Sequence, residues 1–286
     1  MLSEKSFRRR RGIYYSFLGG SYLGMGISLL ALVALVVYIV IKGAPNLSLD
    51  LLFGAYSSRS PSIVPALLGT FYLVLISLGI GAPIGILAAV FLSEYSKSNS
   101  PIVKVIRLAV ETLSGIPSIV YGLFGYLVFV AYLKMGYSLF GGGITLALMI
   151  LPVIVRGVEE SLRAVPNSLR EASFALGAGK ADTTFRIVLP CAMPGIITSI
   201  ILSIGRVLSE SAVLLVTVGM VVNRVPASPL SPGTSLALDI YYFASYGYRE
   251  EASATALVLL LLVLALDGLS LLLGKLLSKG RSYGSK

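Results

Sequence analysis

The chain is poor in the residues that carry most metal and redox chemistry. It contains no histidine, no tryptophan and a single cysteine among 286 residues. One cysteine excludes an internal disulfide, and without histidine or a cysteine cluster a zinc or haem site is not expected. Cys191 opens an apolar run, where we expect a small packing residue. The sequence therefore predicts no metal and no cofactor bound by this chain.

Charged side chains are also scarce. They form 13% of the sequence, whereas about a quarter is usual for a soluble domain. Hydrophobic residues form 56%, and the mean hydropathy is +0.89. This composition predicts an integral membrane protein surrounded by membrane lipid.

Six stretches are long and apolar enough to cross a bilayer, which takes about 20 residues of helix. They are continuously apolar, whereas a membrane barrel strand alternates, so the expected fold class is all-α with six transmembrane helices. The uncharged stretches are 12–41, 60–93, 112–133, 135–155, 187–205 (continuing past Arg206) and 252–266 (extended to residue 274). The expected organisation is a tail over 1–12, a first transmembrane helix over 13–42, a core over 60–275 and a second tail over 276–286.

Lysine and arginine are distributed unequally between the two sides of this topology. With the N-terminus inside, most of them fall in inner segments, and the positive-inside rule then places both termini in the cytoplasm. The outer side holds only Lys42, Arg59, Lys134, Arg224 and Arg249. The net charge of +10 is thus a topology signal, and no nucleic acid partner is expected despite the arginines at 8–11.

Glycine and proline interrupt two of the apolar runs. Gly81 and Gly85 lie one helical turn apart around Pro83, which predicts close helix packing with a kink. The glycines at 141–143 predict an outer turn before the fourth span.

A third interruption, at Gly115 and Pro117, should break the third span. Backbone groups freed at such a break line a cavity or bond to side chains. Ser114 and Ser118 are therefore candidate residues of a substrate pathway. The alternative is that they only hydrogen-bond to backbone groups that the kink leaves without partners.

The segment 157–190 on the inner side is too polar to span and too long for a hairpin. Pro166 and Asn167 predict a helix start, and Gly177 predicts the C-terminal turn that ends this helix. A second short helix is expected over 180–188. Apolar side chains such as Phe174 would suit a pocket on another protein.

Two charges interrupt the fifth apolar run. Arg206 and Glu210 are spaced one turn apart, so we expect them to share a helix face and to be able to pair. A charge inside the membrane costs at least about 2.5 kcal/mol on insertion scales, which makes it a functional candidate. The pair either locks this helix to a neighbour, or Arg206 exchanges Glu210 for a passing oxyanion that suits the guanidinium fork. Arg156, near the inner end of the fourth span, is either a second cationic step or a snorkelling interfacial residue.

The polar segment also carries a spaced pattern, Glu-Ala-Ser at 171–173, a glycine, and Ile-x-Leu-Pro at 187–190. This pattern resembles the loop of permease subunits of ATP-binding-cassette (ABC) importers. An ordinary pair of amphipathic helices explains the length and polarity but not the spacing. The resemblance implies the type I ABC importer permease fold and an ATPase-coupling role for Glu171, Ala172, Gly177, Ile187, Leu189 and Pro190.

A wider likeness over residues 60–275 narrows the family. The stretches 112–122, 151–156, 165–173 and 205–212 resemble phosphate-specific permeases of the PstA type. Ser173 replaces the alanine usual in the loop, and Ser209 replaces a glycine found in many members. The resemblance places Arg156 and Arg206 at positions implicated in phosphate passage.

The resemblance implies three partners: a second, PstC-like permease subunit, a dimeric cytoplasmic ATP-binding subunit and an extracytoplasmic phosphate-binding protein. ATP and Mg would bind the partner ATPase, because Ala181 follows Gly179–Lys180 and no glycine stands at P-loop spacing. The predicted function is a permease without its own ATPase site, in a prokaryotic cell membrane. Sulfate, molybdate or tungstate import remains an alternative, as does a stand-alone channel or secondary carrier.

Overall fold

The computed structural model describes residues 4–57, 61–96 and 100–279, and every regular element among them is a helix. Five helical segments are long and apolar enough to cross a membrane, and a bent pair makes a sixth span. These segments are Ile13–Asn46, Val64–Tyr95, the pair Pro101–Ser114 and Ser118–Tyr132, Leu139–Arg163, Lys180–Leu208 and Arg249–Leu276. The predicted all-α fold with six spans is confirmed.

The elements follow one another without a strand in the described part of the chain. In order they are α1 (Glu4–Gly43), η1 (Ala44–Asn46), α2 (Leu49–Phe53), α3 (Val64–Val90), η2 (Phe91–Tyr95), α4 (Pro101–Ser114), α5 (Ser118–Gly125), η3 (Tyr126–Tyr132), α6 (Leu139–Arg163), α7 (Asn167–Ala175), α8 (Lys180–Thr183), η4 (Thr184–Val188), α9 (Leu189–Leu208), α10 (Ala212–Thr217), α11 (Leu236–Ser245) and α12 (Arg249–Lys279).

Helix α6 forms the centre of the bundle and packs against α3, α5 and α9. The α3–α6 contact depends on small residues, because a Cβ on Gly85 would lie 2.7 Å from Cγ2 of Ile154 and one on Gly81 would lie 3.3 Å from the carbonyl of Ala147. The predicted close packing at these two glycines is therefore confirmed. Pro83 lies inside α3, which runs unbroken to Val90.

The predicted outer turn at residues 141–143 is wrong. Helix α6 begins at Leu139, where the Ser138 side chain accepts a hydrogen bond from the Gly141 amide. A Cβ on Gly142 would lie 2.3 Å from Cγ2 of Val218, and one on Gly143 would lie 2.6 Å from Cγ2 of Ile76. Close packing on two sides thus demands glycine here and overrides its low helix propensity.

The third span breaks where Gly115 and Pro117 predict it. Helices α4 and α5 meet at 100°. The buried Tyr121 hydroxyl reaches back across the break and donates to the Leu113 carbonyl at 2.8 Å. The same carbonyl accepts from the Ile116 amide at 3.2 Å, so it has two donors at the break.

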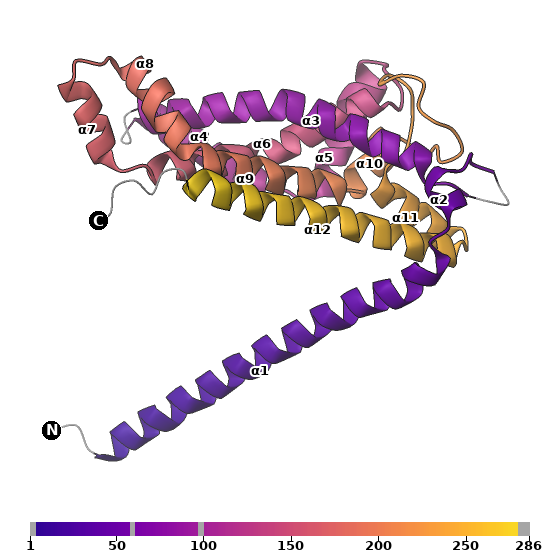
Figure 1. Cartoon of the computed structure of the whole chain (residues 1–286), viewed down its shortest axis with the longest axis horizontal. Coiled ribbons are helices and arrows are strands. Elements are labelled where there is room, and N and C mark those ends of the chain that lie inside the picture. Colours follow the sequence, from indigo (N-terminus) through magenta and orange to yellow (C-terminus); the bar gives the residue numbers. More distant parts are fainter. Residues whose placement is uncertain (1–3, 58–60, 97–99, 280–286) are drawn as a thin grey trace.

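Helix α1 leaves the bundle at a steep angle (Figure 1). It meets α12 near Gly43, where a Cβ would lie 2.6 Å from the Ser253 carbonyl, and nearly all residues from 13 to 42 are exposed within this chain. Residues 4–12 of the predicted first tail and 276–279 of the second are helical, and residues 1–3 and 280–286 lie outside the described part. Helices α3, α6 and α12 run toward the end of the bundle that carries α7 and α8, here called the loop end, and α9 runs away from it (Figure 1).

Candidate functional site

A helical hairpin projects from the loop end of the bundle (Figure 1). Helix α7 ends at Ala175, and the chain turns at Gly177 with φ +82°, a backbone conformation that favours glycine. The predicted second helix over 180–188 starts at Lys180 but does not stop, since it continues through the π-helical turn η4 into α9. The hairpin is therefore a direct extension of a membrane span.

The six residues predicted to couple to an ATPase fall into two groups. Glu171, Ala172 and Gly177 are exposed on the hairpin, whereas Ile187, Leu189 and Pro190 are half-buried at its root. The hairpin tip also exposes Leu176, at 90%, and half of Phe174. The first group and these apolar side chains form a surface that another protein could contact, and the second group attaches the hairpin to the bundle.

Arg170 fixes α7 to two other elements. Its guanidinium donates through Nε and Nη2 to the two carboxylate oxygens of Glu94 in η2, at 3.2 and 2.8 Å. It also donates to the carbonyls of Leu162 and Val165, at 2.9 and 2.7 Å. The Arg170 and Glu94 side chains are only 15% and 8% exposed, so this bidentate ion pair is a well-shielded link between the hairpin and the end of α3.

A second ionic cluster joins α4 to α6. One oxygen of Glu159, Oε1, accepts from Arg107 Nε at 3.1 Å and from Arg163 Nη2 at 2.7 Å. Arg107 also donates to the Leu92 carbonyl. The single carboxylate leaves one positive charge of the two arginines unbalanced.

Arg156, predicted as either a cationic step or a snorkelling interfacial residue, lies one turn before Glu159 in α6. Its guanidinium is 3.9 Å from the carboxylate of Glu111 in α4, and both side chains are more than half exposed. Such an exposed pair stabilises the fold by at most about 1 kcal/mol. Arg156, Glu111, Arg107 and Glu159 line a small cavity of about 160 Å³.

Arg206 and Glu210 do not share a helix face, so that prediction is wrong. Helix α9 ends at Leu208, and the Glu210 carboxylate accepts from the Val213 amide at 3.1 Å, at the start of α10. The Glu210 carboxylate thus satisfies a free backbone amide at the start of α10, and Glu210 itself lies beyond the end of α9. Among the described residues, the ion pairs within 4.0 Å do not include Arg206, which is exposed on the last turn of α9.

The two serines predicted beside the break are half-buried. Ser114 donates to the Glu111 carbonyl of its own helix at 2.7 Å, which favours the alternative that it re-satisfies backbone. Ser118 begins α5 directly after Pro117. A pathway role for both residues stays a prediction.

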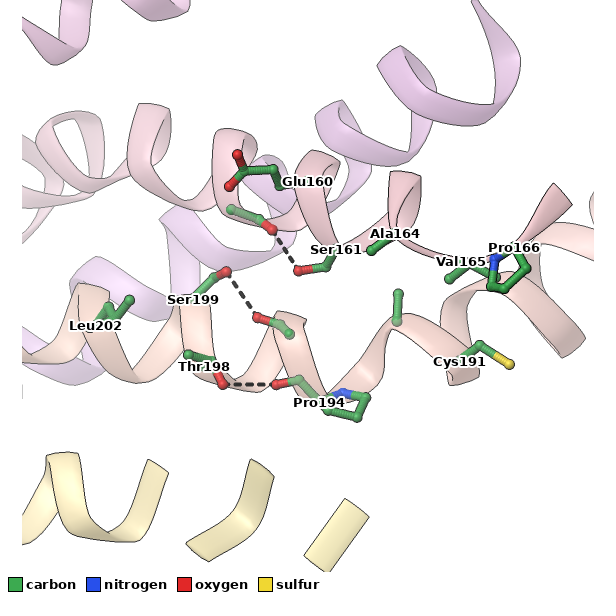
Figure 2. Close-up of a pocket in the computed structure, with 13 residues that line it drawn as sticks. Glu160, Ser161, Ala164, Val165, Pro166, Cys191, Pro194, Thr198, Ser199 and Leu202 are labelled. Carbon is green, nitrogen blue, oxygen red and sulfur yellow. Dashed lines mark hydrogen bonds between the residues drawn. The ribbon is translucent and has the colours of Figure 1, made fainter. Parts of the chain in front are cut away.

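A groove of about 600 Å³ between α6 and α9 is lined mainly by small and apolar residues. Figure 2 shows that the hydroxyls of Ser161, Thr198 and Ser199 point back to carbonyls of their own helices, at 2.6 to 3.0 Å. Cys191, predicted as a packing residue, is half-buried at one end of this groove. With no cation in its lining, the groove offers little to an anion.

Away from the loop end, Asp239 in α11 is fully buried. The Thr234 hydroxyl donates to its Oδ1, whereas Oδ2 has no hydrogen-bond partner in the described structure. Burial raises the pKa of this carboxyl to about 7, against a smaller lowering by the Thr234 hydrogen bond. Tyr56 and Tyr242 lie near enough to interact electrostatically with Asp239, and both also interact with Tyr248.

Sequence reasoning missed both ionic clusters. The spacing of Glu159 and Arg163, one helical turn, could have indicated one ion pair. Arg170 and Glu94 are 76 residues apart, and no local pattern joins them. Helix packing alone brings them together.

The fold and the hairpin define an integral-membrane permease component of a transport system. Residues 81–280 match the family described as binding-protein-dependent transport system inner membrane component, and the chain belongs to this family. The chain is 37% identical over 239 residues to a probable ABC transporter permease protein, YqgI, of Bacillus subtilis, covering 79% of this chain and 81% of that one. It is 35% identical over 257 residues to the phosphate transport system permease protein PstA of Pasteurella multocida, covering 86% and 89%.

Solved structures show the same fold. A chain of a bacterial alginate ABC transporter superimposes with a TM-score of 0.64 over 92% of this chain and 93% of its own length, at 15% identity. A chain of the MetNI methionine ABC transporter gives 0.59 over 75% and 94%, at 20% identity. The type I ABC importer permease fold predicted from the loop is thus confirmed, and the resemblance to the PstA type is supported by identities of 33–45% to several such permeases.

Proposed function

We propose that this chain is the permease subunit of an ATP-driven importer and forms, with a second permease subunit, the path for inorganic phosphate. The main support for the proposal is Arg206, which is exposed on the last turn of α9. The chain is also similar over most of its length to a phosphate permease. A path formed between two subunits requires its ligand groups on the surface of each chain. A guanidinium that stays charged and offers a planar donor fork suits a phosphate there.

The energy for transport enters from partners in this proposal. The exposed hairpin surface with Glu171, Gly177 and Leu176 docks onto a dimeric ATP-binding subunit that holds ATP and Mg. Because η4 is continuous with α9, a movement of the hairpin acts directly on the helix that ends at Arg206. An external phosphate-binding protein delivers the anion to the opposite end of the bundle.

The proposed orientation places the loop end and both termini in the cytoplasm of a prokaryotic cell. This orientation follows from the excess of lysine and arginine in the segments on that side. It also puts the hairpin where a cytoplasmic ATPase can reach it.

Uptake of labelled phosphate by cells or vesicles that contain the assembled transporter tests the proposal. Arg206→Gln is expected to abolish uptake while the ATPase still co-purifies with the permeases, because the change removes the anion ligand and leaves the hairpin intact. Arg224→Gln, at an exposed position in the loop between α10 and α11, is the matched control and should transport normally. Unlabelled sulfate, molybdate or tungstate that competes better than phosphate would reassign the cargo, and normal uptake by Arg206→Gln would remove this residue from the path.

A further inference from the structure

At the loop end, a cavity of about 710 Å³ lies between the bundle and the hairpin. Five elements or their connections contribute to its wall: η2, α4, α6, α7 and the α8–η4 segment. Polar atoms dominate the lining, in contrast to the α6–α9 groove of Figure 2. The charged side chains in the lining are Glu94, Arg107, Arg163, Arg170 and Lys180.

These charges do not balance. Glu94 neutralises Arg170, and Glu159, which stands behind the lining, contacts both Arg107 and Arg163. Lys180 has no carboxylate within 4.0 Å among the described residues, and its ammonium lies 5.5 Å from the centre of the Tyr95 ring. Among the residues that the structure describes, four cations against two carboxylates leave an excess of two positive charges around this cavity.

Unused donors accompany the unbalanced charge. A guanidinium carries five N–H donors, and Arg163 uses one of its terminal nitrogens on Glu159 while 55% of its side chain remains exposed. Lys180, from the hairpin, is also exposed. The two side chains come from different elements, so an anion held by both would connect the hairpin to α6.

We propose that this cavity binds a tetrahedral dianion of the phosphate class, either free hydrogen phosphate or the phosphomonoester headgroup of a lipid. The excess of two positive charges matches a dianion, and guanidinium with ammonium is a donor set suited to phosphate oxygens. Bound there, the anion fixes the hairpin against α4 and α6 and slows the movement that ATP drives. This regulatory consequence rests on the proposed function and orientation, whereas binding in the cavity does not.

The test uses the complete transporter reconstituted in phosphatidylcholine vesicles with the ATPase inside, where phosphate is added to the lumen. Initial uptake of external labelled phosphate and the rate of ATP hydrolysis are measured as lumenal phosphate rises. Both rates are expected to fall. Because one charge-assisted contact is lost, Lys180→Gln and Arg163→Gln should each raise the half-inhibitory phosphate concentration about tenfold. Arg186→Gln, which removes a cation of the same hairpin that is paired with Asp182 outside the cavity, should leave it unchanged.

Vesicles that also contain phosphatidic acid distinguish the two sources. If the lipid headgroup is the ligand, these vesicles show slow hydrolysis without lumenal phosphate, and Lys180→Gln restores the rate. The proposal is overturned if neither lumenal phosphate nor phosphatidic acid slows hydrolysis, or if Arg186→Gln shifts the inhibition as far as Lys180→Gln. An absence of labelled phosphate uptake, together with hydrolysis that still responds to lumenal phosphate through Lys180, would refute the proposed cargo and leave the cavity site standing.

Discussion

The ion pair of Arg170 and Glu94 allows a quantitative test of how the hairpin is held. Removing Arg170 leaves a carboxylate that is 8% exposed without its cation, and two carbonyls lose a donor. Breaking a buried pair in this way costs roughly 3–5 kcal/mol. Arg170→Met is therefore expected to lower the apparent melting temperature of the purified transporter by roughly 6–20 °C, if it follows the scaling of large soluble domains.

The partner substitution should cost less. In Glu94→Gln the guanidinium keeps its carbonyl contacts to Leu162 and Val165, and the new amide oxygen can still accept one hydrogen bond. We expect a loss of about 1–3 kcal/mol, in the range for a lost charge-assisted bond. The double variant should be more stable than the sum of the two single losses predicts, since neither charge is then left unpaired.

Two results would refute this reasoning. Losses that add to within about 0.5 kcal/mol in the double variant would mean that the two side chains act independently. A Glu94→Gln loss larger than that of Arg170→Met would mean that the carboxylate, not the guanidinium, holds the hairpin. If the pair also transmits force, both variants should hydrolyse ATP faster relative to phosphate uptake than the unmodified transporter does.

Three further predictions concern single residues. Gly177→Val should weaken ATPase co-purification or coupled uptake, and Gly177→Asn should be tolerated better. The Cβ position is open, but φ is +82°, and asparagine adopts this backbone conformation more easily than a β-branched residue does. Equal behaviour of the two variants would argue against a conformational role. Gly85→Ala should destabilise the bundle by about 1–3 kcal/mol through overpacking against Ile154, measured against Gly79→Ala, where nothing lies within 4 Å of the Cβ. Burial raises the pKa of Asp239 from 3.8 to about 7, so the folded state holds the proton of this carboxyl more tightly than the unfolded state does. The free energy of unfolding should therefore fall by about 4 kcal/mol in total as pH rises from about 4 to about 7. Thermal scans of Asp239→Asn should lack this pH dependence, and an unchanged dependence would assign it to other groups.

The elements that could be predicted from the sequence are those set by local composition. Long uncharged runs indicate the spans, and Gly115 with Pro117 indicates the break, because these signals act on their own stretch of chain. The glycines at 141–143 indicate a turn by local composition, but they lie in a helix. Gly142 and Gly143 are required there because Val218 and Ile76 pack against them in the folded bundle.

The candidate site shows the same division. The exposed hairpin with Gly177 could be predicted from spacing, and its connection to the bundle through Arg170 and Glu94 could not. The four-residue spacing of Arg206 and Glu210 predicts a pair on one helix face only if the helix continues past both residues. Glu210 instead accepts from the Val213 amide beyond the end of α9, and only the structure shows where that helix ends.

The isolation of α1 has a consequence for assembly. From Ile13 onward α1 forms an apolar span, and the apolar window of this span has no residue buried within the chain. Its position is therefore set by lipid or by a neighbouring subunit, and by the short contact near Gly43. A chain inserted alone would hold its five remaining spans in one bundle while α1 swings about that contact, so the angle of this helix would report on whether the transporter has assembled.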